Sequence, residues 1–260
     1  MPVDLNGVGY GEYSPAKQAD LHGLLTQHGY IAKGIFSKPY ERDNSYVYID
    51  ANAGPGYVPK YRLRGSPLIA LDRISNALDN AQWHFCERVP ANMDQLCDRL
   101  RDNPFWTRIH AWQGSNQVLT PRILDTLGMK DVGLLYHDPT ESVDWGLLRT
   151  AAAHPKAKRI DLLVYFSAAN HKRAGIEIAE ELRQINKEHW IIRDLQGKHQ
   201  FSFLLGTNWN SYPSWKNRGF YPINEARGQY LLDVASWSTK QRHDRDNGQF
   251  DFGDYDATGD

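Results

Sequence analysis

The chain has 260 residues, of which 41% are hydrophobic and 23% are charged, and its formal net charge of -1 argues against a global basic field for nucleic acid. No apolar run approaches the roughly 18 residues that span a membrane, and the two cysteines, Cys86 and Cys97, are too few for a zinc site. We therefore expect a large domain with appendages in the reducing cytoplasm, with no metal centre and no membrane contact.

The N-terminal part predicts an arm and a helix. Residues 1–13 are rich in Gly and Tyr and favour an extended arm. Ser14 suits a helix N-cap and Pro15 the first helical position, so a helix should begin there. We expect the helix to end near Gln27, because Gly29 follows at once.

Residues 46–50 predict a buried strand of β-branched and aromatic residues that ends at Asp50. A turn of small residues follows, in which Gly54 and Gly56 allow a ligand to approach the backbone and Ala53 keeps that approach open. Asp50 is well placed to accept a hydrogen bond from a cationic or hydroxyl group. The pattern Asp-x-x-Ala-Gly-x-Gly resembles the first motif of class I S-adenosylmethionine (SAM) methyltransferases, although a tight loop without a ligand has the same signature.

A basic insertion of about nine residues separates this turn from the next helix, which Ser66 should cap. The segment 57–64 carries Lys60, Arg62 and Arg64. Its length and position predict a mobile loop that orders over substrate or cofactor, and its charge indicates phosphate contacts.

The next two strands also end in polar side chains. Residues 82–86 predict a strand that ends at Glu87, where a carboxylate can accept two hydrogen bonds from a ribose diol. Alternatively, Glu87 caps the following helix or is solvated. Residues 107–111 predict a short strand, after which Gln113 or Asn116 could face an adenine amino group or simply form a turn.

Residues 132–137 predict a strong apolar strand that ends in Asp138 and Pro139. Amino-group methyltransferases carry (Asp/Asn/Ser)-Pro-Pro-aromatic at this strand end. By that resemblance, the Asp138 carboxylate and the Pro139 carbonyl would accept hydrogen bonds from the target amine and aim its lone pair at the methyl group. The second proline and the aromatic residue are absent here, and Trp145 or Phe166 could supply the ring. The alternative is an Asp-Pro turn.

The alternation of strands and helices continues to residue 205. Residues 160–166 predict a strand and 174–185 a helix, with Arg173 before that helix either contacting phosphate or opening it. The strands predicted at 189–192 and 200–205 share so short a turn that they must be antiparallel. The whole pattern favours an α/β Rossmann-like class I methyltransferase fold, with a mostly parallel seven-stranded sheet and an antiparallel last strand.

The C-terminal part is aromatic and then acidic. Its aromatic and basic residues could stack bases, or the segment could pack on the sheet edge. We divide the chain into an arm and helix (1–45), a SAM-binding domain (46–206), an aromatic flap and helix (207–241) and a disordered acidic tail (242–260).

A more specific resemblance covers roughly residues 40 to 175. The segments 48–50, 53–56 and 65–71, followed by Glu87, Asp138-Pro139 with Trp145, and 161–173, resemble the three-Cys-motif partner proteins. These bacterial and phage-associated proteins are built like SAM methyltransferases, so the resemblance implies this fold and SAM as cofactor.

Together, these features predict a SAM-dependent methyltransferase that modifies an amino group of a nucleic acid or nucleotide. One alternative is a non-catalytic subunit that binds SAM or a nucleotide beside a protein partner. The other is a methyltransferase for a small molecule or a protein.

Overall fold

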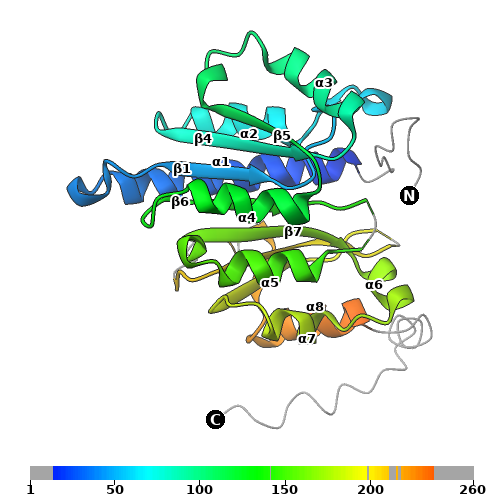
Figure 1. The fold of residues 1–260 in the computed structure, drawn as a ribbon. Helices are drawn as coiled ribbons and strands as arrows, with labels where there is room; N and C mark the ends of the chain where they lie inside the picture. The colour runs from blue at the N-terminus through cyan, green and yellow to red at the C-terminus, as the bar shows by residue number, and fades with distance from the viewer. Residues whose placement is uncertain (1–13, 141, 198, 211–214, 216–217, 237–260) are drawn as a thin grey trace, which may run out of the picture.

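The computed structural model describes residues 14–140, 142–197, 199–210, 215 and 218–236. Within these residues, eight strands form one sheet in the order β10-β8-β9-β7-β6-β1-β4-β5 (Figure 1). In chain order the strands are β1 (Tyr46–Asp50), β4 (Ala81–Glu87), β5 (Ile109–Gln113), β6 (Val132–His137), β7 (Ile160–Ser167), β8 (His189–Arg193), β9 (Phe201–Thr207) and β10 (Phe220–Pro222). The sequence predicts the first seven, and β10 is an addition at the sheet edge.

The strand directions confirm a mostly parallel sheet. Strand β1 lies parallel to both β4 and β6, β5 lies parallel to β4, and β7 lies parallel to β6. Strand β9 is antiparallel to both of its neighbours, β7 and β8, as the short turn between β8 and β9 predicts. Strand β10 adds a second antiparallel strand beside β8.

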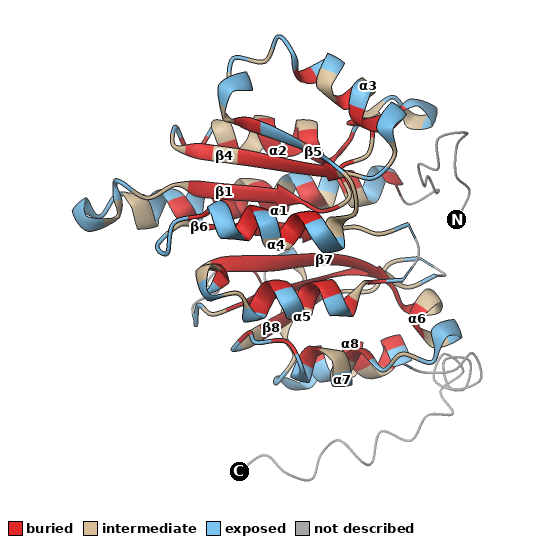
Figure 2. Cartoon of the chain, in the orientation of Figure 1, coloured by how far each residue is buried: buried red, intermediate tan, exposed pale blue. Residues whose placement is uncertain are grey.

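Helices cover both faces of the sheet, because parallel strands need crossover connections. One face packs against α1 (Ser14–Phe36), α2 (Ser66–Ser75) and α3 (Pro90–Leu100), and the other against α4 (Asn116–Thr126), α5 (Trp145–Ala153), α7 (Ile178–Arg183) and α8 (Ala226–Ser236). Figure 2 shows that the central strands are buried along their length. The remaining short helices are η1 (Pro39–Glu41), η2 (Pro59–Tyr61), η3 (Trp106–Arg108), η4 (Pro155–Ala157) and α6 (Ala168–Ala174).

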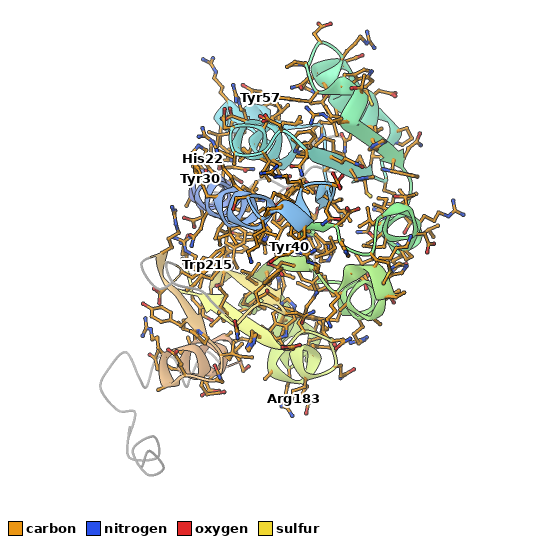
Figure 3. The ribbon with its side chains drawn as sticks, turned by 90° about the vertical axis from the view of Figure 1, so that its left-hand side faces the viewer. His22, Tyr30, Tyr40, Tyr57, Arg183 and Trp215 are labelled. Atoms are coloured by element: carbon orange, nitrogen blue, oxygen red, sulfur yellow. The ribbon has the colours of Figure 1, made fainter. Side chains whose placement is uncertain are left out.

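Helix α1 is longer than the sequence predicts. It continues to Phe36 rather than ending near Gln27. A Cβ atom at Gly29 would lie 3.1 Å from the Cβ atom of Ala77, just beyond α2, so this glycine permits close packing between helices. Figure 3 shows α1, marked by its residues His22 and Tyr30, lying against the sheet. The predicted stop is therefore wrong, since the packing of two helices outweighs the low helix propensity of glycine.

Three other predicted elements differ from the structure. The helix predicted over 174–185 is shorter in the structure, where α7 runs only from Ile178 to Arg183, and a separate helix that the sequence does not predict, α6, precedes it and is ended by Gly175 at a φ of 65°. Arg173 therefore lies in the last turn of α6. The strand predicted from 107 begins at Ile109, after η3. Residues 57–64 form a hairpin of β2 (Tyr57–Val58) and β3 (Leu63–Arg64) around η2.

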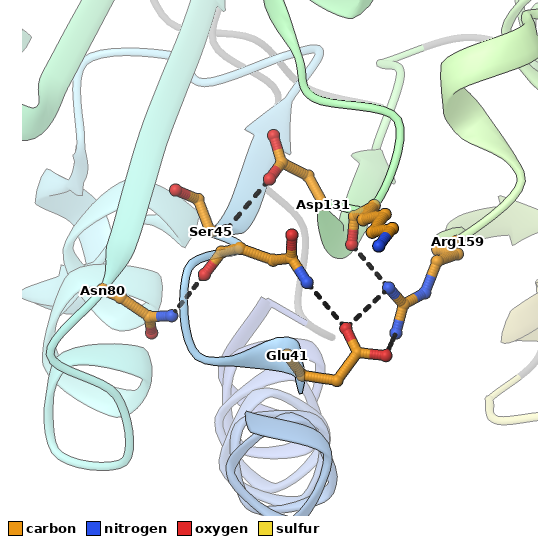
Figure 4. Close-up of polar contacts among 7 residues, drawn as sticks. Glu41, Ser45, Asn80, Asp131 and Arg159 are labelled. Atoms are coloured by element: carbon orange, nitrogen blue, oxygen red, sulfur yellow. Dashed lines mark hydrogen bonds and ion pairs between the residues drawn. The ribbon is translucent and has the colours of Figure 1, made fainter. Parts of the chain in front are cut away.

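A polar network fixes the amino end of β1 (Figure 4). Arg159 donates to both carboxylate oxygens of Glu41 at 2.9 and 3.1 Å, and to the carbonyl of Lys130 at 2.6 Å. The backbone N–H of Ser45 donates to Asp131 at 2.9 Å. Hydrogen bonds from the Arg159 guanidinium hold the pKa of the Glu41 carboxyl below its usual range. The network joins the start of β1 to the turns before β6 and β7.

The described part of the C-terminal segment packs on the protein. Trp215 and Phe220 are 3% and 1% exposed, and their rings meet edge to face. Figure 3 places Trp215 beside α1, so the packing alternative holds for these two rings. The predicted arm (1–13) and acidic tail (242–260) lie outside the described residues. Among the residues that are described, no helix is long and apolar enough to cross a bilayer.

Candidate functional site

The carboxyl ends of β1, β4, β5 and β6 lie at one edge of the sheet, and the predicted site residues follow those ends. Because these strands are neighbours and parallel, the loops that leave them meet, which is where open α/β sheets bind ligands. The N-terminal turns of α1 reach the same edge (Figure 1).

The turn after β1 is tied to both neighbouring strands. The N–H of Ala51 donates to the Tyr136 carbonyl of β6, and that of Ala53 to the Cys86 carbonyl of β4, both at 2.9 Å. Gly54 and Gly56 have φ angles of 61° and 75°, a region that favours glycine. A Cβ atom at Gly54 would have no neighbour within 4 Å, so space is open beside this backbone. The turn is thus held rigidly while one of its glycines faces free space.

Glu87 supports this turn directly. One of its carboxylate oxygens accepts the N–H of Gly54 at 2.9 Å, and the other accepts the N–H of Val89 at 2.7 Å. The side chain is only half-buried, and each oxygen keeps a lone pair for a further donor. The capping alternative is therefore present, yet the carboxylate can still accept hydroxyl groups.

Asp50 lies under the turn and has no exposed surface. One carboxylate oxygen accepts the N–H of Asn52 at 3.1 Å. Burial raises the pKa of this carboxyl to about 7, although a hydrogen bond from Ser66 acts in the opposite direction. Asp50 is therefore a buried acid whose charge changes near neutral pH.

Asn116 lies at the start of α4 and faces the same turn. Its side-chain N–H donates to the Ala51 carbonyl at 3.2 Å, which positions the amide at the end of β1. Gln113, the other candidate for an adenine contact, is exposed at the end of β5. The contact with Ala51 favours Asn116 over Gln113 as a site residue.

Asp138 is fixed on both sides. Its backbone N–H donates to the side-chain oxygen of Asn52 at 3.3 Å, which ties the end of β6 to the turn after β1. Its carboxylate accepts the ammonium of Lys17 from α1 at 2.8 Å, and both side chains are only 16% exposed. Pro139 follows outside any helix or strand. The carboxylate that the sequence assigns to a substrate amine thus already holds an amine of its own chain.

Two residues predicted to contact the substrate, Trp145 and Arg173, lie away from Asp138 and the glycine turn. Trp145 is 4% exposed, and its ring edge meets His171 inside the core on the α5 face. It therefore presents no ring face to a base, because the aromatic residue opens α5 and packs inward. Arg173 is exposed and donates to the side chain of Asn170 within α6.

The basic residues lie on the β2–β3 hairpin. Lys60, Arg62 and Arg64 are all exposed, and Arg64 approaches Asp72 only at 3.8 Å. The hairpin begins directly after the glycine turn. The N–H of Gly65 donates to the Gly56 carbonyl at 2.8 Å, which holds the two ends of the hairpin together. The three positive charges of the hairpin therefore lie within ten residues of the glycine turn along the sequence.

Sequence reasoning missed Lys17 and Tyr165. The Lys17 ammonium lies 5.1 Å from the centre of the Tyr165 ring while it pairs with Asp138. Neither residue belongs to a recognisable motif. Only its position near the start of a helix could have marked Lys17, and that signal is weak.

Replacing Glu87 by alanine should weaken SAM binding by about 1 to 2 kcal/mol, or roughly 5- to 30-fold. The change removes an acceptor for the ribose and the acceptor of the Gly54 N–H, so the turn also loses support. Calorimetry with SAM measures the effect. Glu87→Gln is the matched control, because its amide oxygen can replace one of the two acceptors, and it should bind between wild type and Glu87→Ala. Equal affinity of wild type and Glu87→Ala would remove this residue from the cofactor site.

No protein-family model matches the sequence, and no match is found among curated proteins. Solved structures do match. A protein from Legionella pneumophila superposes with a TM-score of 0.52 at 13% identity, over 83% of this chain and 90% of that one. The N-terminal domain of human METTL16, solved in complex with SAH, has a TM-score of 0.50 at 12% identity, over 81% of this chain and 76% of that one. At these identities the likeness concerns architecture alone: the chain has the α/β Rossmann-like fold of class I methyltransferases.

Proposed function

We propose that this protein is a SAM-dependent methyltransferase that transfers the methyl group to an amine. The observation that carries the proposal is the contact between the Asp138 carboxylate and the side-chain nitrogen of Lys17, beside the glycine turn. The contact shows that the carboxylate accepts an N–H donor at the strand end where amino-group methyltransferases orient their acceptor.

The residues around the turn fit SAM. Open space beside Gly54 leaves room for a ligand against the backbone, and the half-buried carboxylate of Glu87 suits a ribose diol. Asn116 carries an amide at the position where an adenine would be recognised. The bound cofactor would supply a methyl group on a sulfonium, which needs no further activation.

The remaining task for the protein is to hold the acceptor. Asp138 accepts an N–H of the amine, and the Pro139 carbonyl can accept a second, so that the nitrogen lone pair is directed at the methyl group. The Asp138 backbone is itself anchored to Asn52, so the carboxylate keeps a fixed place relative to the cofactor turn.

For the acceptor, we propose an amino group of a nucleic acid or nucleotide, because the hairpin beside the turn carries three exposed cations, Lys60, Arg62 and Arg64. We also propose that the protein is related to the three-Cys-motif partner proteins, which its sequence resembles. A second candidate, an alkyl amine of a small molecule or a protein, is favoured by the charged Lys17–Asp138 contact. In the non-catalytic alternative, the protein would bind SAM without turnover beside a protein partner.

Calorimetry with SAM and with S-adenosylhomocysteine (SAH) tests the cofactor, and mass spectrometry of DNA and RNA from expressing cells tests the nucleic-acid acceptor. We expect both ligands to bind, and methylated bases to appear only in cells that express the protein. Binding without any methylated product would support the non-catalytic alternative, and absence of binding at millimolar SAM would refute the proposal.

If the hairpin binds phosphates, replacing Lys60, Arg62 and Arg64 together by alanine should weaken polyanion binding and flatten its salt dependence. Each lost phosphate contact reduces the slope of log K against log [salt] by about 0.7 to 0.9. Fluorescence titration with a labelled oligonucleotide at two salt concentrations measures both effects. Replacement of the exposed Arg101, Arg122 and Lys130, which lie outside the hairpin, is the matched control. Unchanged affinity and slope in the hairpin variant would exclude a phosphate role.

A further inference from the structure

The ammonium of Lys17 lies between a carboxylate and an aromatic ring. The Asp138 carboxylate accepts it at 2.8 Å, and the Tyr165 ring centre lies 5.1 Å away. A carboxylate and an aromatic ring are the two groups by which proteins bind organic ammonium ions. The two groups come from the end of β6 and from β7, which are neighbouring strands of the sheet.

Asp138 and Tyr165 are held more firmly in place than the Lys17 side chain that contacts them. Asp138 follows a buried strand and its N–H is bonded to Asn52, while Tyr165 is 9% exposed and packs against Phe201 and Phe203. Lys17, by contrast, reaches the site through four methylene groups from the first turns of α1. Its ammonium can therefore leave by rotation of its own side chain, while the carboxylate and the ring stay in place.

Helix α1 does not depend on this ion pair for its position. Asp20, one turn further along, pairs with Arg193 and accepts the side-chain N–H of Gln196 at 3.0 Å. Leu21, Leu24 and Leu25 are almost fully buried against the sheet. Because these contacts anchor α1, removal of the Lys17 side chain should leave the place beside Asp138 and Tyr165 empty without moving the helix.

We propose that the Asp138 carboxylate and the Tyr165 ring form a binding subsite for a protonated alkyl amine, and that Lys17 fills this subsite in the free protein. A carboxylate that is only 16% exposed is costly to leave without a partner, so an amine that displaces Lys17 replaces its charge. The identity of the incoming amine rests on the second candidate of the proposed function: it is an alkyl-amine methyl acceptor that takes the place of the Lys17 nitrogen. It binds as the ammonium ion and gives one proton to the Asp138 carboxylate or to water before its nitrogen attacks the methyl group.

The test is chemical rescue of a truncated lysine. Lys17→Ala removes three carbons and the nitrogen, which n-propylammonium replaces, and 1-propanol is the neutral control of the same length. Thermal unfolding of wild type, Lys17→Ala, and Lys17→Ala combined with Asp138→Asn or with Tyr165→Leu is followed at constant ionic strength. Circular dichroism checks that each variant is folded, and Lys17→Ser replaces Lys17→Ala if the latter is not.

We expect 100 mM propylammonium to raise the Tm of Lys17→Ala by about 2 to 4 °C, with little effect on wild type, whose subsite is filled. The shift should vanish with Asp138→Asn, shrink with Tyr165→Leu, and be absent with propanol. Equal shifts in wild type and Lys17→Ala, or a shift that survives Asp138→Asn, would overturn the proposal. The assay contains no cofactor, so its failure is distinct from a failure to bind SAM.

Discussion

Replacing Asp138 by alanine should lower the rate of methyl transfer by about 10² or more while SAM affinity stays nearly unchanged. The carboxylate is the group that accepts the N–H of the acceptor amine, and loss of one preorganised polar group commonly costs 10²- to 10³-fold in turnover. SAM affinity is spared because the contacts proposed for the cofactor come from Glu87, Asn116 and the glycine turn. A methyl-transfer assay and calorimetry with SAM, carried out on the same preparation, separate the two effects.

Asp138→Asn is the matched control, because the amide oxygen still accepts an N–H while the negative charge is lost. It should keep part of the activity, since the oxygen still orients the nitrogen. If Asp138→Ala transfers methyl groups as fast as wild type, the acceptor is held elsewhere. If that variant instead loses SAM binding or stability, the Lys17–Asp138 ion pair is structural and the non-catalytic alternative gains support.

The sequence predicts the central sheet well because its signals are local. Strands β1, β4 and β6 are short runs made mostly of apolar or aromatic residues, and a carboxylate residue ends or directly follows each run. Such runs fold in only a few ways. The predicted polar residues therefore meet at one edge, as parallel strand ends must.

Contacts between distant segments could not be predicted in the same way. The Lys17–Asp138 pair joins residues 121 positions apart, and Lys17 has no partner signal near it in the sequence. Gly29 reads as a helix stop, because its close approach to Ala77 exists only in the folded protein. Trp145 is a candidate stacking ring in the sequence, because its burial depends on α6, whose His171 packs beside it only in the folded protein.

Replacing Asp50 by asparagine should abolish a pH dependence of stability between pH 5 and pH 8. The pKa of Asp50 is about 7 in the folded protein, above the usual value of 3.8, because the carboxyl is buried. Between these two values the folded state holds a proton that the unfolded state has released. The free energy of unfolding of wild type should therefore fall as pH rises towards 7, relative to the variant, by about 2 to 3 kcal/mol.

Urea unfolding of both proteins at pH 5 and pH 8 measures this difference. Histidines that titrate in the same range contribute equally to both proteins, so the comparison isolates Asp50. A difference between wild type and Asp50→Asn that does not change with pH would place the Asp50 pKa near its usual value.

The same titration should report on the cofactor. A cation bound near Asp50 favours the charged carboxylate and lowers its pKa, so SAM binding at pH 6.5 should release a fraction of a proton from wild type. Calorimetry in two buffers that differ in ionisation enthalpy detects this release, and Asp50→Asn should not show it. Because Asp50 lies directly beneath the turn that contains Gly54, proton release would tie cofactor binding to that turn rather than to another part of the protein.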